Sequence, residues 1–208
     1  MLLLACATDA DRYLMASRAV SFDAAEEWCM QLDQPGECLA GAVVRFDRWD
    51  ACERFSGRRR DDCVFMAAEA RARTGAVEQA LKDCAAIRWD RQCDGHILGV
   101  VAHAAMDVPA AAARFEALRP LLVSPSAELD YWRAYWRAQM ERAAPIAAEG
   151  CPLRVCVDAA RTELEATFHR DYREVPCAEP APAMPGAETG QAHMWVLEAH
   201  QRWCKAAP

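Results

Sequence analysis

The stretch GAVEQALKDCAAIRWDRQCDGHIL, residues 75–98, predicts how this chain folds. Its first half has apolar residues at the three- and four-residue spacing of an amphipathic helix, in Val77, Ala80, Leu81, Cys84 and Ile87. A short link follows at Arg88–Gln92, and a second apolar run begins at Ile97. The pattern predicts two antiparallel helices joined by a turn, with a cysteine on each side of the turn and within bridging distance.

The same cysteine spacing occurs once more, earlier in the chain, and a looser copy lies between the two. Ala25, Cys29, Leu32 and Cys38 repeat the order of Ala80, Cys84, Ile87 and Cys93 at a constant offset of 55 residues. A looser copy between them, Cys52, Phe55 and Cys63, has two residues inserted. We therefore predict the disulfides Cys29–Cys38, Cys52–Cys63 and Cys84–Cys93, each stabilising its hairpin by roughly 2–3 kcal/mol.

The repeated segment resembles the tetratricopeptide repeat over about residues 61–94. Gly75, Ala80, Cys84 and Ile87 follow the spacing of that repeat, and Val64, Ala67 and Ala68 stand where its first helix has packing residues. The Trp-Leu-Gly signature and the late proline of the repeat are missing. With its paired cysteines, the region of residues 22–98 is more similar to the Sel-type relatives found in secreted bacterial proteins. The resemblance implies a helical scaffold that binds a protein or peptide partner, without a cofactor and without enzyme activity.

Composition also favours helices. The chain has 208 residues, 53% of them hydrophobic, and no alternating Val/Ile/Thr runs typical of strands. We expect an all-α fold, an array of antiparallel helical hairpins (a short α-solenoid-like stack or an irregular bundle) cross-linked by disulfides. The net charge of −7 argues against nucleic acid or an anionic membrane surface as the main partner.

The cysteines and the N-terminus bear on the compartment. Eleven cysteines indicate disulfides if the protein is exported. Leu3-Leu4-Ala5-Cys6 resembles the lipobox of bacterial lipoproteins, which implies lipid on Cys6 and a place on the periplasmic side of a membrane, or secretion. Residues 1–6 are then a signal-peptide remnant, although the basic n-region and long apolar core of such a peptide are missing from the sequence. The alternative is that the four residues Met1–Leu4 begin the first helix. No apolar run reaches the ~20 residues of a membrane span, so the lipid would be the only tie to the membrane.

Along the chain we expect cysteine-stapled hairpins over residues 7–106, with helices at 7–20, 22–32, 37–47 and 48–56 and a turn at Asp33–Gly36. Further helices follow over residues 107–175, then a Pro/Ala-rich loop at 176–190 and a C-terminal helix within 191–208. Four cysteines in this half, Cys151, Cys156, Cys177 and Cys204, allow three pairings, and the sequence does not choose among them.

One predicted helix carries four aromatic residues close together: Tyr131, Trp132, Tyr135 and Trp136. Such a stripe packs into a helical core or lines a groove for a partner or ligand. Because aromatic residues often anchor interfaces, these four are the candidate partner-binding residues of the sequence.

Few residues suggest chemistry. Glu165 and His169 lie four apart on a predicted helix, as an acid–base pair or as part of a solvated face in which Arg161 pairs with Glu165. We predict no catalytic site, with an enzyme using Glu165 and His169 as the least favoured alternative.

Metal binding by copper or zinc is the other alternative function. His96 and His103 are seven residues apart, as are His193 and His200, a spacing too long for two ligands of one metal on a straight helix. Cys93 and His96 have the spacing of half a zinc site, but Cys93 belongs to the repeated cysteine pattern. We therefore predict no metal site.

Overall fold

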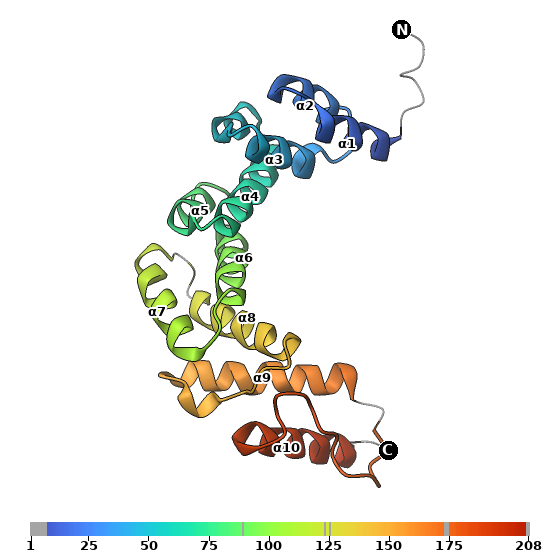
Figure 1. The fold of residues 1–208 in the computed structure, drawn as a ribbon, viewed down its shortest axis with the longest axis vertical. Helices are drawn as coiled ribbons and strands as arrows, with labels where there is room; N and C mark the ends of the chain where they lie inside the picture. The colour runs from blue at the N-terminus through green and yellow to red at the C-terminus, as the bar shows by residue number, and fades with distance from the viewer. Residues whose placement is uncertain (1–7, 89, 123, 125, 173–174, 207–208) are drawn as a thin grey trace. The chain divides into compact units, whose positions relative to one another are not determined.

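The computed structural model describes residues 8–88, 90–122, 124, 126–172 and 175–206. In this part of the chain all regular secondary structure is helical (Figure 1). Two compact units, Met1–Ile97 and Leu98–Pro208, divide the chain within helix α6 (Asp90–His103). The predicted all-α fold of disulfide-linked helical hairpins is confirmed.

Unit 1 is built from neighbouring helices that pack in chain order. Its elements are α1 (Asp9–Arg18), α2 (Phe22–Cys29), α3 (Pro35–Arg45), the 3₁₀ helix η1 (Trp49–Arg54), α4 (Arg58–Arg73), α5 (Val77–Cys84) and the first part of α6. Helices α1, α2, α3, α4 and α5 pack on one another in chain order, and η1 lies against α3 and α4. Small and branched apolar residues fill the core, among them Ala25, Leu39, Val43, Ala68 and Leu81.

Local sequence signals begin the first two helices. Thr8 accepts a hydrogen bond from the Asp11 backbone N–H, and Asp11 accepts one from the Thr8 backbone N–H, which is a capping box. Ser21 caps α2 by accepting from the Ala24 N–H at 3.3 Å. These hydrogen bonds satisfy backbone N–H groups that a helix leaves unpaired at its start.

The three disulfides predicted from the cysteine spacing are present in unit 1. Cys29–Cys38, Cys52–Cys63 and Cys84–Cys93 have Cα–Cα distances of 5.4, 5.5 and 5.4 Å. Cys29 and Cys84 end their helices and Cys52 lies within η1, and each is bonded to a cysteine of the next helical element along the chain. The spacing of the paired cysteines along the sequence therefore indicates where the chain turns between two helical elements.

Two local expectations for unit 1 are wrong. Pro35 and Gly36 do not form a turn; Pro35 is the first residue of α3, where its fixed φ suits a helix start and its missing N–H costs no hydrogen bond. Residues 48–56 do not form an α-helix but the shorter η1. Asp47 precedes it with a φ of 54°, a left-handed conformation that ends the preceding helical path.

Unit 2 has a large aromatic core. The rest of α6 is followed by α7 (Val108–Leu118), the 3₁₀ helix η2 (Arg119–Leu121), α8 (Ala127–Glu141), the 3₁₀ helix η3 (Ala148–Gly150), α9 (Arg154–Asp171) and α10 (Gly190–Ala206). Helix α8 packs on α9, and α9 packs on α10. The largest fully buried side chains here are Phe115, Tyr131, Trp132, Trp136 and Phe168.

The C-terminal cysteines form one of the three predicted alternatives, Cys151–Cys156 and Cys177–Cys204. The second bond ties the irregular segment before α10 to the end of that helix. In the same segment Gly186 has a φ of 79°, and its carbonyl accepts a hydrogen bond of 2.8 Å from the Ile146 N–H. The proline-rich segment is thus held to unit 2 at more than one point.

The five disulfides use ten cysteines and indicate an oxidising, extracellular or periplasmic compartment. None of the described helices is both long and apolar enough to cross a membrane. Cys6, the candidate lipidation site, lies outside the described residues, as do the other residues of the segment 1–6.

Candidate partner-binding groove

Unit 1 has an open groove of about 310 Å³ lined by η1, α4 and α5. Trp49 and Glu53 line it from η1, Arg71 from α4, and Gln79, Lys82 and Asp83 from α5. Both charge signs and one large aromatic ring therefore meet in one concave site.

The disulfide Cys52–Cys63 positions one wall of this groove. It joins the middle of η1 to the first half of α4. The indole of Trp49 is oriented by a hydrogen bond from its Nε1–H to the Asp47 carboxylate. The half-buried Trp49 ring is thus held in place by its own loop and by the staple of its helix.

Polar contacts of Arg71 connect the side of the groove formed by η1 to the side formed by α5. The guanidinium carbon of Arg71 lies 4.0 Å from the centroid of the Trp49 ring, within cation–π distance. Arg71 also forms an ion pair with Asp83, and the second oxygen of that carboxylate accepts a hydrogen bond of 2.9 Å from Gln79. The contacts connect η1, α4 and α5 across the groove.

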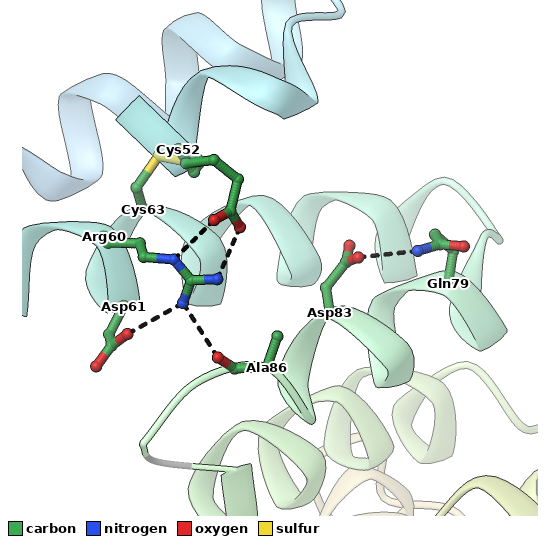
Figure 2. A network of polar contacts seen from close by, with 8 residues as sticks. Cys52, Arg60, Asp61, Cys63, Gln79, Asp83 and Ala86 are labelled. Atoms are coloured by element: carbon green, nitrogen blue, oxygen red, sulfur yellow. Dashed lines mark hydrogen bonds and ion pairs between the residues drawn. A yellow bond between two sulfur atoms is a disulfide. The ribbon is translucent and has the colours of Figure 1, made fainter. Parts of the chain in front are cut away.

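Arg60 of α4 connects two residues that line the groove, Glu53 of η1 and Ala86 in the segment that follows α5 (Figure 2). Its Nε and Nη2 donate to the two carboxylate oxygens of Glu53 at 2.9 and 2.7 Å, and its Nη1 donates to the Ala86 carbonyl at 3.1 Å. The hydrogen bonds to Glu53 raise the pKa of Arg60 above its ordinary value. A further ion pair of 3.5 Å joins Arg60 to the buried Asp61. Such bidentate pairing favours a fixed geometry.

Lys82 is the cation of the groove that remains available. It is exposed on α5 and forms no ion pair with any residue that the structure describes. Arg71, in contrast, is already paired with Asp83. An incoming carboxylate would therefore meet Lys82 without displacing an existing ion pair.

The aromatic stripe on α8 lies in the core of unit 2. Tyr131, Trp132, Tyr135 and Trp136 are each at most 2% exposed. The Tyr131 hydroxyl donates to a backbone carbonyl at 2.8 Å, and the Trp136 indole N–H donates to another at 2.9 Å. Burial raises the pKa of Tyr131 and of Tyr135 to about 12 in each case. The candidate partner-binding residues of the sequence are thus core residues, and none presents its ring to solvent.

Glu165 and His169 have separate partners. Glu165 forms ion pairs with Arg161 at 2.8 Å and Arg202 at 2.7 Å, which includes the predicted Arg161–Glu165 pair. Burial alone would raise the pKa of Glu165, but hydrogen bonds from the two arginines outweigh it and lower that pKa. His169 packs against the Trp203 ring, with 6.0 Å between ring centroids. The arrangement favours a salt-bridged helix face over an acid–base pair.

The histidines also have individual contacts. His96 lies 3.0 Å from Glu69, His103 lies 3.3 Å from Glu141, and His200 lies 3.6 Å from the sulfur of Cys204. Within the described ranges no three His, Cys, Asp or Glu residues are grouped to hold a metal ion. The sulfur of Cys93 is bonded to Cys84.

The groove residues were not predicted from the sequence. Trp49, Arg71 and Asp83 come from three elements and show no shared spacing. One feature of the sequence bears on this site: Trp49 stands three residues before Cys52, a cysteine of a predicted disulfide, in a helix predicted to form a hairpin with the next helix. Comparison of the chain with known protein families, curated proteins and solved structures finds no match.

Proposed function

We propose that this protein is an exported, non-enzymatic helical-repeat scaffold that binds a segment of a partner protein in the groove of unit 1. The observation that carries the proposal is the groove itself, with a half-buried tryptophan, a fixed arginine and an available lysine in one concavity. Tryptophan and arginine in partly enclosed sites are the residue types that contribute most to protein–protein binding. The resemblance of this region to tetratricopeptide and Sel-type repeats agrees with such a role.

The chemistry of the groove suggests what the segment contains. Lys82 favours an acidic side chain or a terminal carboxylate, and the ring of Trp49 favours an apolar neighbour. Because Arg60 and Cys52–Cys63 already fix the walls, binding requires little ordering of this unit. A short acidic and apolar segment is therefore the occupant that we propose.

The test uses the fact that lysine occurs at only two positions, Lys82 and Lys205. An amine-reactive crosslinker added to an envelope fraction should join the peptide that contains Lys82 to one partner segment. A synthetic peptide of that segment should bind the purified protein, and Lys82→Glu should weaken binding about tenfold, the loss of roughly 1.4 kcal/mol. Lys205→Glu is the matched control and should leave binding unchanged.

Two outcomes contradict the proposed groove. The first is a crosslink that forms through Lys205 alone. The second is peptide binding of equal affinity in the wild type and in a folded Lys82→Glu variant, with folding checked by far-ultraviolet circular dichroism.

We also propose that the protein is a lipoprotein of the bacterial cell envelope, attached through Cys6. The lipobox-like Leu3–Cys6 and the oxidising compartment that the disulfides indicate support this proposal. Cells fed an alkyne-tagged fatty acid should incorporate it into the protein, and Cys6→Ser should abolish the label. Equal labelling of the variant would contradict attachment at Cys6.

The alternative function, copper or zinc binding by reduced cysteines, has less support. Metal sites of this kind use thiolates, whereas ten of the cysteines are engaged in disulfides.

A further inference from the structure

The five disulfides differ in how much of each bond is accessible. In unit 1 all six bonded cysteines are at most 5% exposed. In unit 2 Cys156 is fully buried, Cys151 and Cys204 are half-buried, and Cys177 is exposed. Thiol–disulfide exchange requires that a thiolate reach a sulfur in line with the bond, so access differs strongly among the five. Among the ten described disulfide cysteines, Cys177 is the only exposed residue, and we therefore take its sulfur as the one open to an external thiol.

A histidine lies beside the other sulfur of the same bond. His200 Nε2 is 3.6 Å from the Sγ of Cys204, one turn away on α10. His200 is only 7% exposed as a residue, and its ring makes an edge contact with Phe168 at 6.1 Å between centroids. A neighbouring imidazole stabilises a thiolate, and a more stable thiolate leaves faster in exchange. The two sulfurs therefore suit different roles in exchange: Cys177 Sγ can be attacked by an external thiolate, and Cys204 Sγ can leave as a thiolate beside His200.

We propose that Cys177–Cys204 is a thiol–disulfide exchange site of this protein, with Cys177 as the attacked sulfur and Cys204 as the leaving sulfur. A thiolate of an external dithiol attacks Cys177 Sγ; a new S–S bond forms, the Cys177–Cys204 bond breaks, and its electron pair goes to Cys204 Sγ beside His200. The second thiol of the dithiol, after losing its proton to solvent, attacks its own sulfur in the mixed disulfide and releases the Cys177 thiolate. The dithiol is oxidised to a disulfide, and Cys177 and Cys204 are reduced.

The fold can tolerate this reaction because α10 is held by more than the disulfide. Its face toward the core buries Ala192, Trp195, Val196 and Ala199. Ion pairs from Arg161 to Glu198 at 2.9 Å and from Arg202 to Glu165 at 2.7 Å also connect α9 and α10. Reduction therefore separates Cys177 from α10, while α10 stays packed on α9 and the hydrogen bond from Ile146 to Gly186 still holds the later part of the segment. The partner of this chemistry is a dithiol protein or small dithiol of the same oxidising compartment.

The first test measures the order of reduction in the folded wild-type protein. Dithiothreitol is added at increasing concentration, free thiols are trapped by alkylation, and labelled peptides are identified by mass spectrometry. Cys177 and Cys204 should be labelled at least about tenfold faster than any buried pair, with an unchanged far-ultraviolet spectrum. Earlier labelling of another pair, or labelling of all pairs together as the spectrum is lost, would overturn the proposal.

The second test addresses the direction of attack and the part played by His200. Reduced glutathione should form its mixed disulfide on Cys177; an adduct on Cys204 would contradict the assigned roles. His200→Phe keeps an aromatic ring against Phe168 but removes the imidazole, so reduction by dithiothreitol should slow about tenfold. His193→Phe on the same helix is the matched control and should react at the wild-type rate. Equal rates for His200→Phe and the wild type would refute the role of His200.

Discussion

Replacing Cys84 and Cys93 together by alanine removes the staple of the hairpin whose sequence predicts the fold. The bond closes a loop with a sequence separation of 9 residues. In the chain-entropy model a loop of this size stabilises the folded state by about 2.7 kcal/mol. Both sulfurs are also fully buried, and losing each of them removes roughly 0.8 kcal/mol of burial, as for a methylene group.

The expected loss is therefore about 4 kcal/mol, a large fraction of the 5–15 kcal/mol that stabilises a typical domain. For a unit the size of Met1–Ile97 this corresponds to a decrease in Tm of about 15–30 °C. Guanidinium unfolding without reductant, followed by far-ultraviolet circular dichroism, measures the change. The transitions of the two units are fitted separately if they do not coincide.

The matched control is the double replacement Cys151→Ala and Cys156→Ala in unit 2. That bond closes a shorter loop, with a sequence separation of 5 residues, so the entropy model predicts a smaller loss of about 2 kcal/mol from loop closure. A loss below about 1 kcal/mol for the Cys84 and Cys93 variant would refute the view that this staple holds the hairpin closed.

Three further predictions concern single residues. Trp136→Phe leaves the Cys156 carbonyl without its donor at 2.9 Å and should cost about 1–3 kcal/mol, measured by chemical unfolding. Gly186→Ala should lower the Tm of unit 2 and reduce its free energy of unfolding by at least about 1–2 kcal/mol. The reasons are that φ at this position is 79° and that the new Cβ would lie 2.2 Å from the Ala144 carbonyl oxygen. An unchanged Tm would show that Gly186 does not lie this close to Ala144. For Glu69, burial raises the pKa, but hydrogen bonds from Arg73 and His96 outweigh it and lower that pKa from its ordinary value of 4.5. The contribution of Glu69 to stability is therefore present above pH 4.5 and lost as pH falls through the lowered pKa. Glu69→Gln should flatten that acid limb of a curve of unfolding free energy against pH.

The sequence predicted the helical hairpins well because cysteine spacing and helical periodicity are both local. Cys84 ends a helix and Cys93 lies near the start of the next, so a separation of nine residues already describes the turn. One of the two exceptions was residues 48–56, where the apolar pattern does not show that Asp47 takes a positive φ and that a 3₁₀ helix follows.

The candidate site was harder to predict because it depends on contacts between elements. The stripe on α8 has the composition of an interface, yet packing of α8 on α9 buries it. Trp49 and Arg71 are unremarkable in the sequence, and only the fold brings one over the other at 4.0 Å. Aromatic content alone does not separate a core from a binding surface, since both favour the same residues.

Counting free thiols in the purified, unreduced protein, with disulfide mapping by mass spectrometry, tests the central claim most directly. The claim is that five disulfides staple an exported helical scaffold. We predict no free thiol among the ten described cysteines and the pairs Cys29–Cys38, Cys52–Cys63, Cys84–Cys93, Cys151–Cys156 and Cys177–Cys204. Ten titratable thiols in the native protein, or peptides linked in other pairs, would contradict it.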